Sequence, residues 1–146
     1  MKLLTKNTDY AVRALICLAR EKGRYVSSRE IAEREKIPLS YLRRLLQDLA
    51  REGLVSSREG AGGGVRLAGD PGRIELIRLI GIFQGKLDLA ECLFRNHVCP
   101  NRSRCPLRRQ LKKIEENVLA DLAGITIGGL VRDVEGVSHE EKGNQD

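Results

Sequence analysis

Aromatic side chains are scarce in this sequence. Tryptophan does not occur, and phenylalanine, tyrosine and tryptophan together make up 3% of the 146 residues. The core must therefore be built from leucine, isoleucine, valine and alanine, which suits packed helices better than a sandwich of strands. The length is that of one domain with a real core, and it is small for an enzyme with two lobes.

A long apolar run is also missing from the first twenty residues, because charged side chains interrupt them throughout. This pattern excludes a secretory signal and a membrane span, and it predicts a cytoplasmic protein. The cytoplasm is reducing, so the four cysteines are better explained as metal ligands or reactive thiols than as structural disulfides. The interrupting residues are Lys2, Lys6, Asp9, Arg13 and Arg20.

Acidic residues are outnumbered by basic ones. The formal net charge is +6 and the isoelectric point is near 9.4. Such a balance favours polyanionic partners such as nucleic acid, although many ordinary proteins are equally basic. We find neither a nucleophile–base pair nor a phosphate-binding loop in the sequence, so we expect the protein not to be an enzyme.

The first two predicted helices are separated by a short connection. Residues 7–21 carry apolar side chains at helical spacing over much of the helix circumference, as in a helix packed between others. Ser27 and Glu30 have the spacing of a capping box, in which each side chain bonds the backbone of the other residue. This box predicts a second, short helix over residues 28–36.

The following segment completes a winged helix. Pro38 suits the first position of a third helix that ends near Glu52, and two short strands, 54–58 and 65–67, flank the glycine-rich loop 60–64. Two short helices joined by a tight turn form a helix-turn-helix, so the fold class is mainly α with a small β wing. The apolar stripe of the third helix consists of Leu42, Leu45, Leu46 and Leu49.

The second helix of a helix-turn-helix places its first turns against base edges in the major groove. Arg43 and Arg44 can form bidentate bonds with guanine, and the wing can approach the DNA backbone or minor groove. A solvated helix face and an ordinary hairpin would explain the same residues, but the succession of elements favours DNA binding. The candidate DNA contacts are Ser28, Ser40, Tyr41, Arg43, Arg44, Arg58, Gly62, Gly63 and Arg66.

The C-terminal half predicts a sensor loop and a helix that pairs with a partner. We divide the chain into four regions. The first is a winged helix-turn-helix region (1–83), which ends in an apolar helix over 73–83, and the second is a cysteine-rich loop (84–105). A dimerisation helix from Pro106 with a terminal helix over 126–134 follows, and the last region is a disordered polar tail (135–146). The long helix carries a narrow apolar seam typical of helix pairing. The seam consists of Leu107, Leu111, Ile114, Val118 and Leu122.

Three cysteines, Cys92, Cys99 and Cys105, are separated by six and five residues. Structural zinc sites usually use closer pairs, whereas iron–sulfur clusters accept more varied loops but need a fourth ligand. Cys17 lies in the apolar pattern of the first helix and is expected to be buried. Three reduced thiols or a thiol switch would also explain the segment. Nearby cationic or ionisable side chains that favour thiolates are Arg95, His97, Arg102, Arg104, Arg108 and Arg109.

Taken together, these features resemble the Rrf-two family of bacterial regulators, over residues 2–133. The resemblance implies a homodimer paired through the long helix, an iron–sulfur cluster (4Fe-4S or 2Fe-2S) on the three cysteines, and repression controlled by the state of the cluster. The matching residues are Ser28-Arg29-Glu30-Ile31-Ala32-Glu33, Leu39-Ser40-Tyr41-Leu42, Gly53-Leu54-Val55, Gly62-Gly63-Gly64, the three cysteines and Thr126-Ile127-Gly128-Gly129-Leu130-Val131.

Departures from the family pattern bear on the fourth ligand. IscR-like members carry a histidine three residues after the third cysteine, where this chain has Arg108. NsrR-like members use an acid at the start of the first helix of the other subunit, and Asp9 matches that position. The resemblance thus implies Asp9 as the fourth metal ligand, with His97 or water as alternatives. IscR-like proteins carry an acid where this chain has Arg43, so their operator preference is not transferred.

The sequence therefore predicts a dimeric regulator of a double-stranded DNA operator whose affinity depends on an iron–sulfur cluster that senses redox state, nitric oxide, oxygen or cluster status. An electron carrier would need the cluster but not the wing or the arginines of the third helix. A cluster-free winged-helix regulator, controlled by thiol oxidation or by a partner protein, is the alternative.

Overall fold

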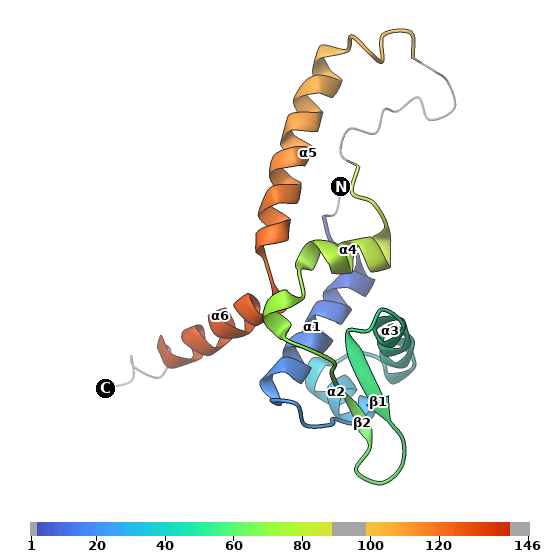
Figure 1. Ribbon diagram of the computed structural model, residues 1–146, viewed down its shortest axis with the longest axis vertical. Helices are drawn as coiled ribbons and strands as arrows, with labels where there is room; N and C mark the ends of the chain where they lie inside the picture. Colours follow the sequence, from blue (N-terminus) through green and yellow to red (C-terminus); the bar gives the residue numbers. More distant parts are fainter. Residues whose placement is uncertain (1–2, 89–98, 141–146) are drawn as a thin grey trace.

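The computed structural model describes residues 3–88 and 99–140, with side chains described as far as residue 136. These residues form a winged-helix body from which two helices project (Figure 1). The elements are α1 (Lys6–Arg20), α2 (Ser28–Glu35), α3 (Leu39–Arg51), β1 (Val55–Arg58), β2 (Gly64–Leu67), the 3₁₀ turn η1 (Pro71–Arg73), α4 (Leu76–Gln84), α5 (Pro106–Gly124) and α6 (Ile127–Glu140).

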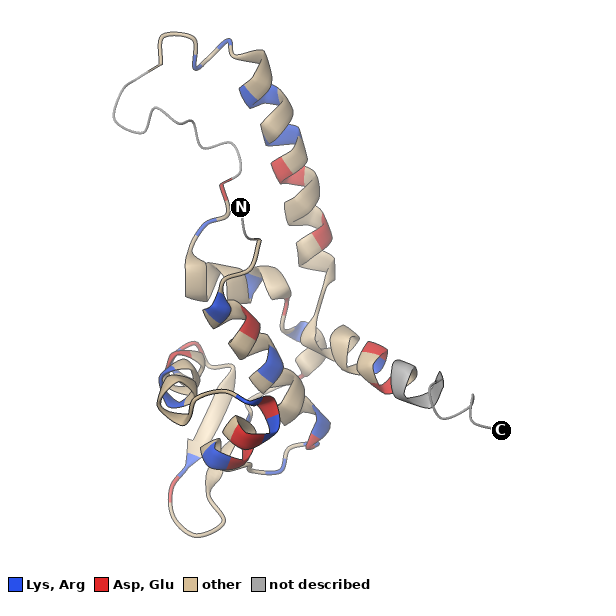
Figure 2. Cartoon of the chain, turned by 180° about the vertical axis from the view of Figure 1, so that it is seen from behind, with Lys and Arg blue, Asp and Glu red and all other residues tan. Residues whose placement is uncertain are grey.

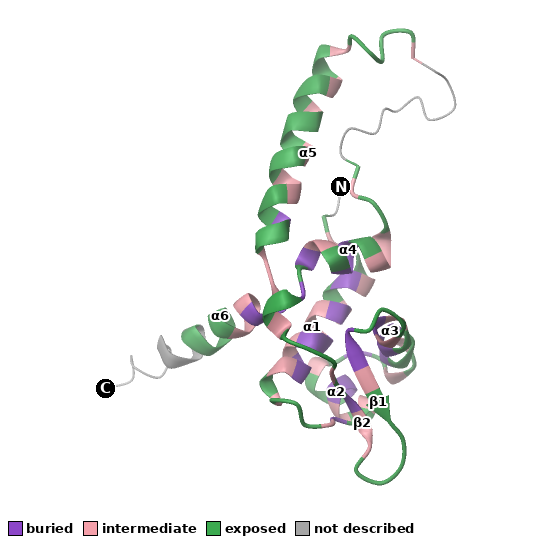
Figure 3. Cartoon of the chain, viewed as in Figure 1, coloured by how far each residue is buried: buried purple, intermediate pink, exposed green. Residues whose placement is uncertain are grey.

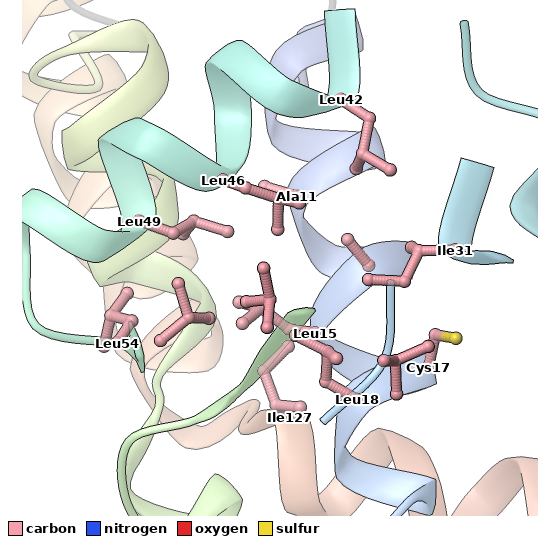
Figure 4. Packing of buried hydrophobic residues seen from close by; sticks show 14 of the residues in the cluster. Ala11, Leu15, Cys17, Leu18, Ile31, Leu42, Leu46, Leu49, Leu54 and Ile127 are labelled. Carbon is pink, nitrogen blue, oxygen red and sulfur yellow. The ribbon is translucent and has the colours of Figure 1, made fainter. Parts of the chain in front are cut away.

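Helix α1 is the centre of the core. It packs against α2, α3, α4, α6 and β2, and Ala11, Ala14 and Leu15 are fully buried. The leucine stripe of α3 faces α1, as Figure 4 shows for Leu42, Leu46 and Leu49. The small side chains of α1 allow several helices to approach it closely, so a core with few aromatic residues still excludes water.

The helix-turn-helix forms as predicted, with local differences at its caps. The Ser27 side chain accepts a hydrogen bond from the Glu30 backbone N–H at 3.1 Å, which confirms that half of the capping box. The Glu30 carboxylate accepts hydrogen bonds from Arg24 and Arg34. Pro38 is the N-cap of α3 and Leu39 its first residue, one position later than predicted.

The wing is an antiparallel hairpin in which Ser56 pairs with Arg66 and Arg58 with Gly64. A third segment joins it, because Val26 and Val65 exchange both backbone hydrogen bonds, at 2.9 and 2.8 Å. The connection between α1 and α2 therefore lies along β2 and fixes the base of the wing to the core.

The helix predicted over residues 73–83 begins later than expected, at Leu76. The side chain of Asp70 caps the 3₁₀ turn η1. The next residues are extended, because the Leu76 N–H donates to the Ile125 carbonyl and the Ile74 carbonyl accepts from the N–H of Ile127, the first residue of α6. Gly128 is required here, since a Cβ at this position would lie 2.8 Å from the Gly72 nitrogen. This contact explains the first of the two glycines at the start of α6.

Helix α6 is longer than predicted and corrects the proposed tail. It continues to Glu140, so residues 135–140 are helical, whereas residues 141–146 lie outside the described part. Helix propagation is favourable once a first turn is fixed, and the packing of Ile127, Leu130 and Val131 on the core fixes that turn. Within residues 3–88 and 99–140, no helix combines the length and apolar composition that a membrane crossing requires.

Candidate nucleic-acid interface and cysteine site

An open groove of about 620 Å³ runs between α3 and the wing. Helix α3 supplies Arg43, Gln47 and Arg51, and Ser28 and Ser57 lie on the opposing elements. The groove brings together Ser28 and Arg43, both predicted from the sequence as DNA contacts. Ser40 and Arg44 are exposed on the first two turns of the same helix.

Gln47 and Arg51 are groove residues that the sequence analysis did not single out. They follow Arg43 at intervals of four residues, so all three side chains lie on one face of α3. Glutamine can form a bidentate pair with adenine, as arginine can with guanine. Extending the arginine pattern by one and two helical turns would have found both residues.

Tyr41 is held by the first turns of α1. Its hydroxyl donates a hydrogen bond to the Asn7 side-chain oxygen, and its ring meets the Tyr10 ring edge-on, with centroids 5.5 Å apart. Lys6 Nζ lies 5.3 Å from the centroid of the Tyr10 ring and 6.0 Å from that of Tyr41. These contacts therefore let the start of α1 set the position of the start of α3. The sequence pattern did not predict them.

The two wing arginines, Arg58 and Arg66, share one aromatic neighbour. Their guanidinium carbons lie 4.4 and 4.8 Å from the centroid of the Tyr25 ring. Arg58 also donates to the Gly62 carbonyl at 2.9 Å. Gly63 serves the closure of the wing loop, because a Cβ there would lie 2.3 Å from the Arg58 carbonyl oxygen. Basic positions occur on α1, α3, the wing and α5 (Figure 2).

The cysteine segment is described only in part, because Cys92 and His97 lie outside the described residues. Cys99 and Cys105 are half-buried free thiols, and Cys105 is the N-cap of α5. The N-terminal end of a helix carries a partial positive charge, which favours a bound anionic group. Among the described residues, no three histidine, cysteine, aspartate or glutamate side chains gather as a metal site.

Cys17 is buried in the core next to α2, as the sequence predicted (Figure 4). Burial, with the nearby negative charge of Glu35, raises the pKa of the Cys17 thiol, although a hydrogen bond with Arg34 acts in the opposite direction. A thiol with a raised pKa carries less thiolate at neutral pH and is a poorer metal ligand.

Asp9 lies in the first turn of α1 with its side chain 56% exposed. Its carboxylate is 3.7 Å from Arg13, and Arg13 also donates to the backbone carbonyl of Glu35, the last residue of α2. Figure 1 shows the N-terminal end of α5 far from α1. Asp9 therefore does not join Cys105 within one chain.

The predicted seam of α5 has two different parts. Leu107 and Ile114 are 66% and 51% exposed, whereas Leu122 is buried and Val118 packs beside it against α4. Figure 3 shows most of α5 exposed along its length. The outer part of the seam is exposed among the residues that the structure describes, and the inner part joins α5 to the body.

Comparison with known proteins identifies the family. Residues 4–133 match the model of the Rrf2 family, described as "Iron-dependent Transcriptional regulator". The HTH-type transcriptional repressor NsrR of Streptomyces coelicolor is 34% identical over 130 residues, covering 88% of this chain and 87% of the relative.

Solved structures show the same fold. The chain matches T. potens IscR with a TM-score of 0.73 and 27% identity, covering 94% of this chain and 90% of the other. It matches CymR, the global cysteine regulator of B. subtilis, with a TM-score of 0.73 and 26% identity, covering 90% and 98%. The winged-helix fold and the resemblance are thus confirmed, and the chain belongs to the Rrf2 family of transcriptional regulators.

Proposed function

We propose that this regulator binds its DNA operator as a homodimer whose affinity is set by an iron–sulfur cluster on Cys92, Cys99 and Cys105. The observation that carries the proposal is the position of Cys105. Cys105 occupies the N-cap position of α5, and the exposed apolar face of the same helix is suited to pair with a second copy. A metal site at this point would lie beside the dimer interface.

The described residues fit a cluster. Thiolates are the usual ligands of iron–sulfur clusters, Cys99 and Cys105 are unpaired, and the flanking arginines offset the negative charge that bound thiolates carry. A bound cluster would supply a group whose charge and ligation change with oxidants or nitric oxide. The flanking arginines are Arg102, Arg104, Arg108 and Arg109.

Two contacts support a route from the cysteine site to the DNA-reading elements. If Asp9 reaches the cysteines of the second copy as the fourth ligand, its carboxylate leaves Arg13, which bonds the end of α2. The neighbouring Tyr10 packs against Tyr41 at the start of α3. A shift of the first turn of α1 would therefore change the position of the reading helix, and a dimer must present both reading helices at the correct spacing.

Replacing Arg43 with alanine should reduce the preference for operator over random DNA by about 5- to 150-fold, since a good bidentate pair contributes roughly 1–3 kcal/mol. Arg66→Ala is the matched control, because it should weaken both DNAs about equally and flatten the salt dependence. Fluorescence anisotropy over a salt series measures both effects. An unchanged operator preference in Arg43→Ala would place the reading face elsewhere.

Asp9→Ala should keep the three thiolates bound to iron but shift the visible spectrum, speed cluster loss and uncouple DNA affinity from nitric oxide. Oxygen ligands are weaker and more exchangeable than thiolates, so one iron should be more accessible than in an all-cysteine site. Arg13→Gln is the control for the spectrum and the cluster lifetime, since it removes the ion pair and keeps the carboxylate. If Asp9→Ala leaves spectrum, lifetime and response unchanged, His97 becomes the next candidate.

The likeness to CymR favours a second candidate function, that of a cluster-free regulator controlled by thiol oxidation or a partner protein. CymR and IscR match this chain with the same TM-score, so the fold does not separate the two functions. Colour separates them, because anaerobically purified protein with a cluster is brown. Either function is that of a regulator and not of an enzyme.

A further inference from the structure

Tyr25 lies in the connection between α1 and α2, beside the wing. It precedes Val26, which exchanges both backbone hydrogen bonds with Val65 of β2. This pairing holds the Tyr25 backbone beside the wing. The side chain is half-buried, and both wing arginines contact its ring.

The register of the hairpin explains why two arginines reach one ring. Arg66 pairs with Ser56, and Arg58 is two residues further along β1. Residues in this diagonal relation lie on the same face of a hairpin. Two like charges on one face repel each other, and each arginine has many rotamers, so without a third group they would be spread over many positions.

The Tyr25 ring provides that third group. Guanidinium groups 4.4 and 4.8 Å from the ring centroid are within the range of a cation–π contact. Each arginine makes one further bond to the wing: Arg58 to the Gly62 carbonyl at 2.9 Å, and Arg66 to the Ser56 hydroxyl at 3.4 Å. A guanidinium has five N–H donors, so donors remain for a phosphate.

We propose that Tyr25 is a positioning residue that holds Arg58 and Arg66 in place for the phosphodiester backbone of DNA. The proposal rests on the proposed DNA binding and assigns a partner group to the wing. Because phosphates carry no sequence information directly, Tyr25 should contribute to affinity for any duplex. Discrimination between sequences should remain with Arg43 and its neighbours on α3.

The test uses full-length dimer, a duplex enriched by selection on the parent protein, and a random duplex of equal length. Tyr25→Leu should bind both duplexes about 4- to 25-fold more weakly, because each of the two cation–π contacts contributes a factor of roughly 2 to 5. The dependence of affinity on salt should become shallower by about one phosphate contact. Tyr25→Phe keeps the ring and should bind like the parent.

Side-chain NMR of the protein without DNA supplies a measurement that does not depend on binding. The Arg58 and Arg66 side-chain signals should be shifted by the ring current in the parent and in Tyr25→Phe, and unshifted in Tyr25→Leu. Unshifted signals in the parent would overturn the proposal, even if Tyr25→Leu fails to fold.

The binding outcomes separate this proposal from the function on which it rests. If the parent selects an operator and Tyr25→Leu matches it in affinity and salt dependence, Tyr25 has no positioning role. The same conclusion follows if Tyr25→Phe is as weak as Tyr25→Leu. If the parent binds neither duplex, the proposed function is wrong and the positioning role falls with it.

Discussion

Replacement of Cys92, Cys99 or Cys105 by serine, one at a time, is expected to abolish or strongly destabilise the visible chromophore of anaerobically purified protein. A serine hydroxyl is a far weaker ligand than a thiolate, and a site with only three cysteines has no spare thiolate. Absorption spectra together with iron and sulfide analysis measure the loss.

Cys17→Ala is the matched control for the serine series. Its thiol is buried in the core and has a raised pKa, mainly through burial. The variant should keep the full chromophore. If Cys17→Ala loses the chromophore while one of the serine variants keeps it, the ligand assignment is wrong.

A second large effect is expected from the double variant Leu107→Glu and Ile114→Glu, which should be monomeric at concentrations where the parent is a dimer. Both side chains are more than half exposed in the single chain, so the fold should tolerate the change. In a symmetric interface each substitution counts twice. Burial of each apolar side chain contributes about 1.5–3 kcal/mol, so the four side chains lost from the dimer reduce the free energy of association by about 6–12 kcal/mol. This loss is comparable with the whole affinity of a micromolar to nanomolar dimer.

The matched control is Ala120→Glu and Ala123→Glu. These two exposed residues lie on the opposite side of α5, given 3.6 residues per turn, and the change in net charge is the same. Sedimentation should show a dimer for the control and a monomer for the seam variant. A seam variant that sediments as a dimer would refute pairing through α5. Val118 is a poorer choice for this test because it packs against α4, so a charge there would also disturb the fold.

The helix-turn-helix could be predicted from the sequence because its signals are local. The Ser27 cap, Pro38 and the leucine stripe of α3 each act within a few residues, and they agree with the observed elements to within one residue. The start of α4 could not be predicted in the same way. Its position depends on backbone hydrogen bonds between residues 74–76 and residues 125–127 at the start of α6, which are far apart in the sequence.

The features of the candidate site likewise fall into two groups, those predicted by local sequence signals and those that depend on tertiary contacts. The positions of Arg43 and Cys105 follow from helix periodicity and from Pro106 at the start of α5. The fixing of Tyr41 by Asn7 and the stacking of the wing arginines on Tyr25 are tertiary contacts between separate elements. No spacing in the sequence signals them. The metal-ligand roles of Asp9, Cys92, Cys99 and Cys105 stay predictions, because they depend on a second chain and on residues outside the described part.

The most direct test of cluster control is the operator affinity of one anaerobic preparation, measured before and after exposure to nitric oxide and after removal of the cluster. The protein should be brown and contain iron and sulfide, and its affinity should change by about 5- to 150-fold, the usual range of coupling between two sites. Equal operator affinity with and without the cluster, or stoichiometric zinc in place of iron, would contradict the account.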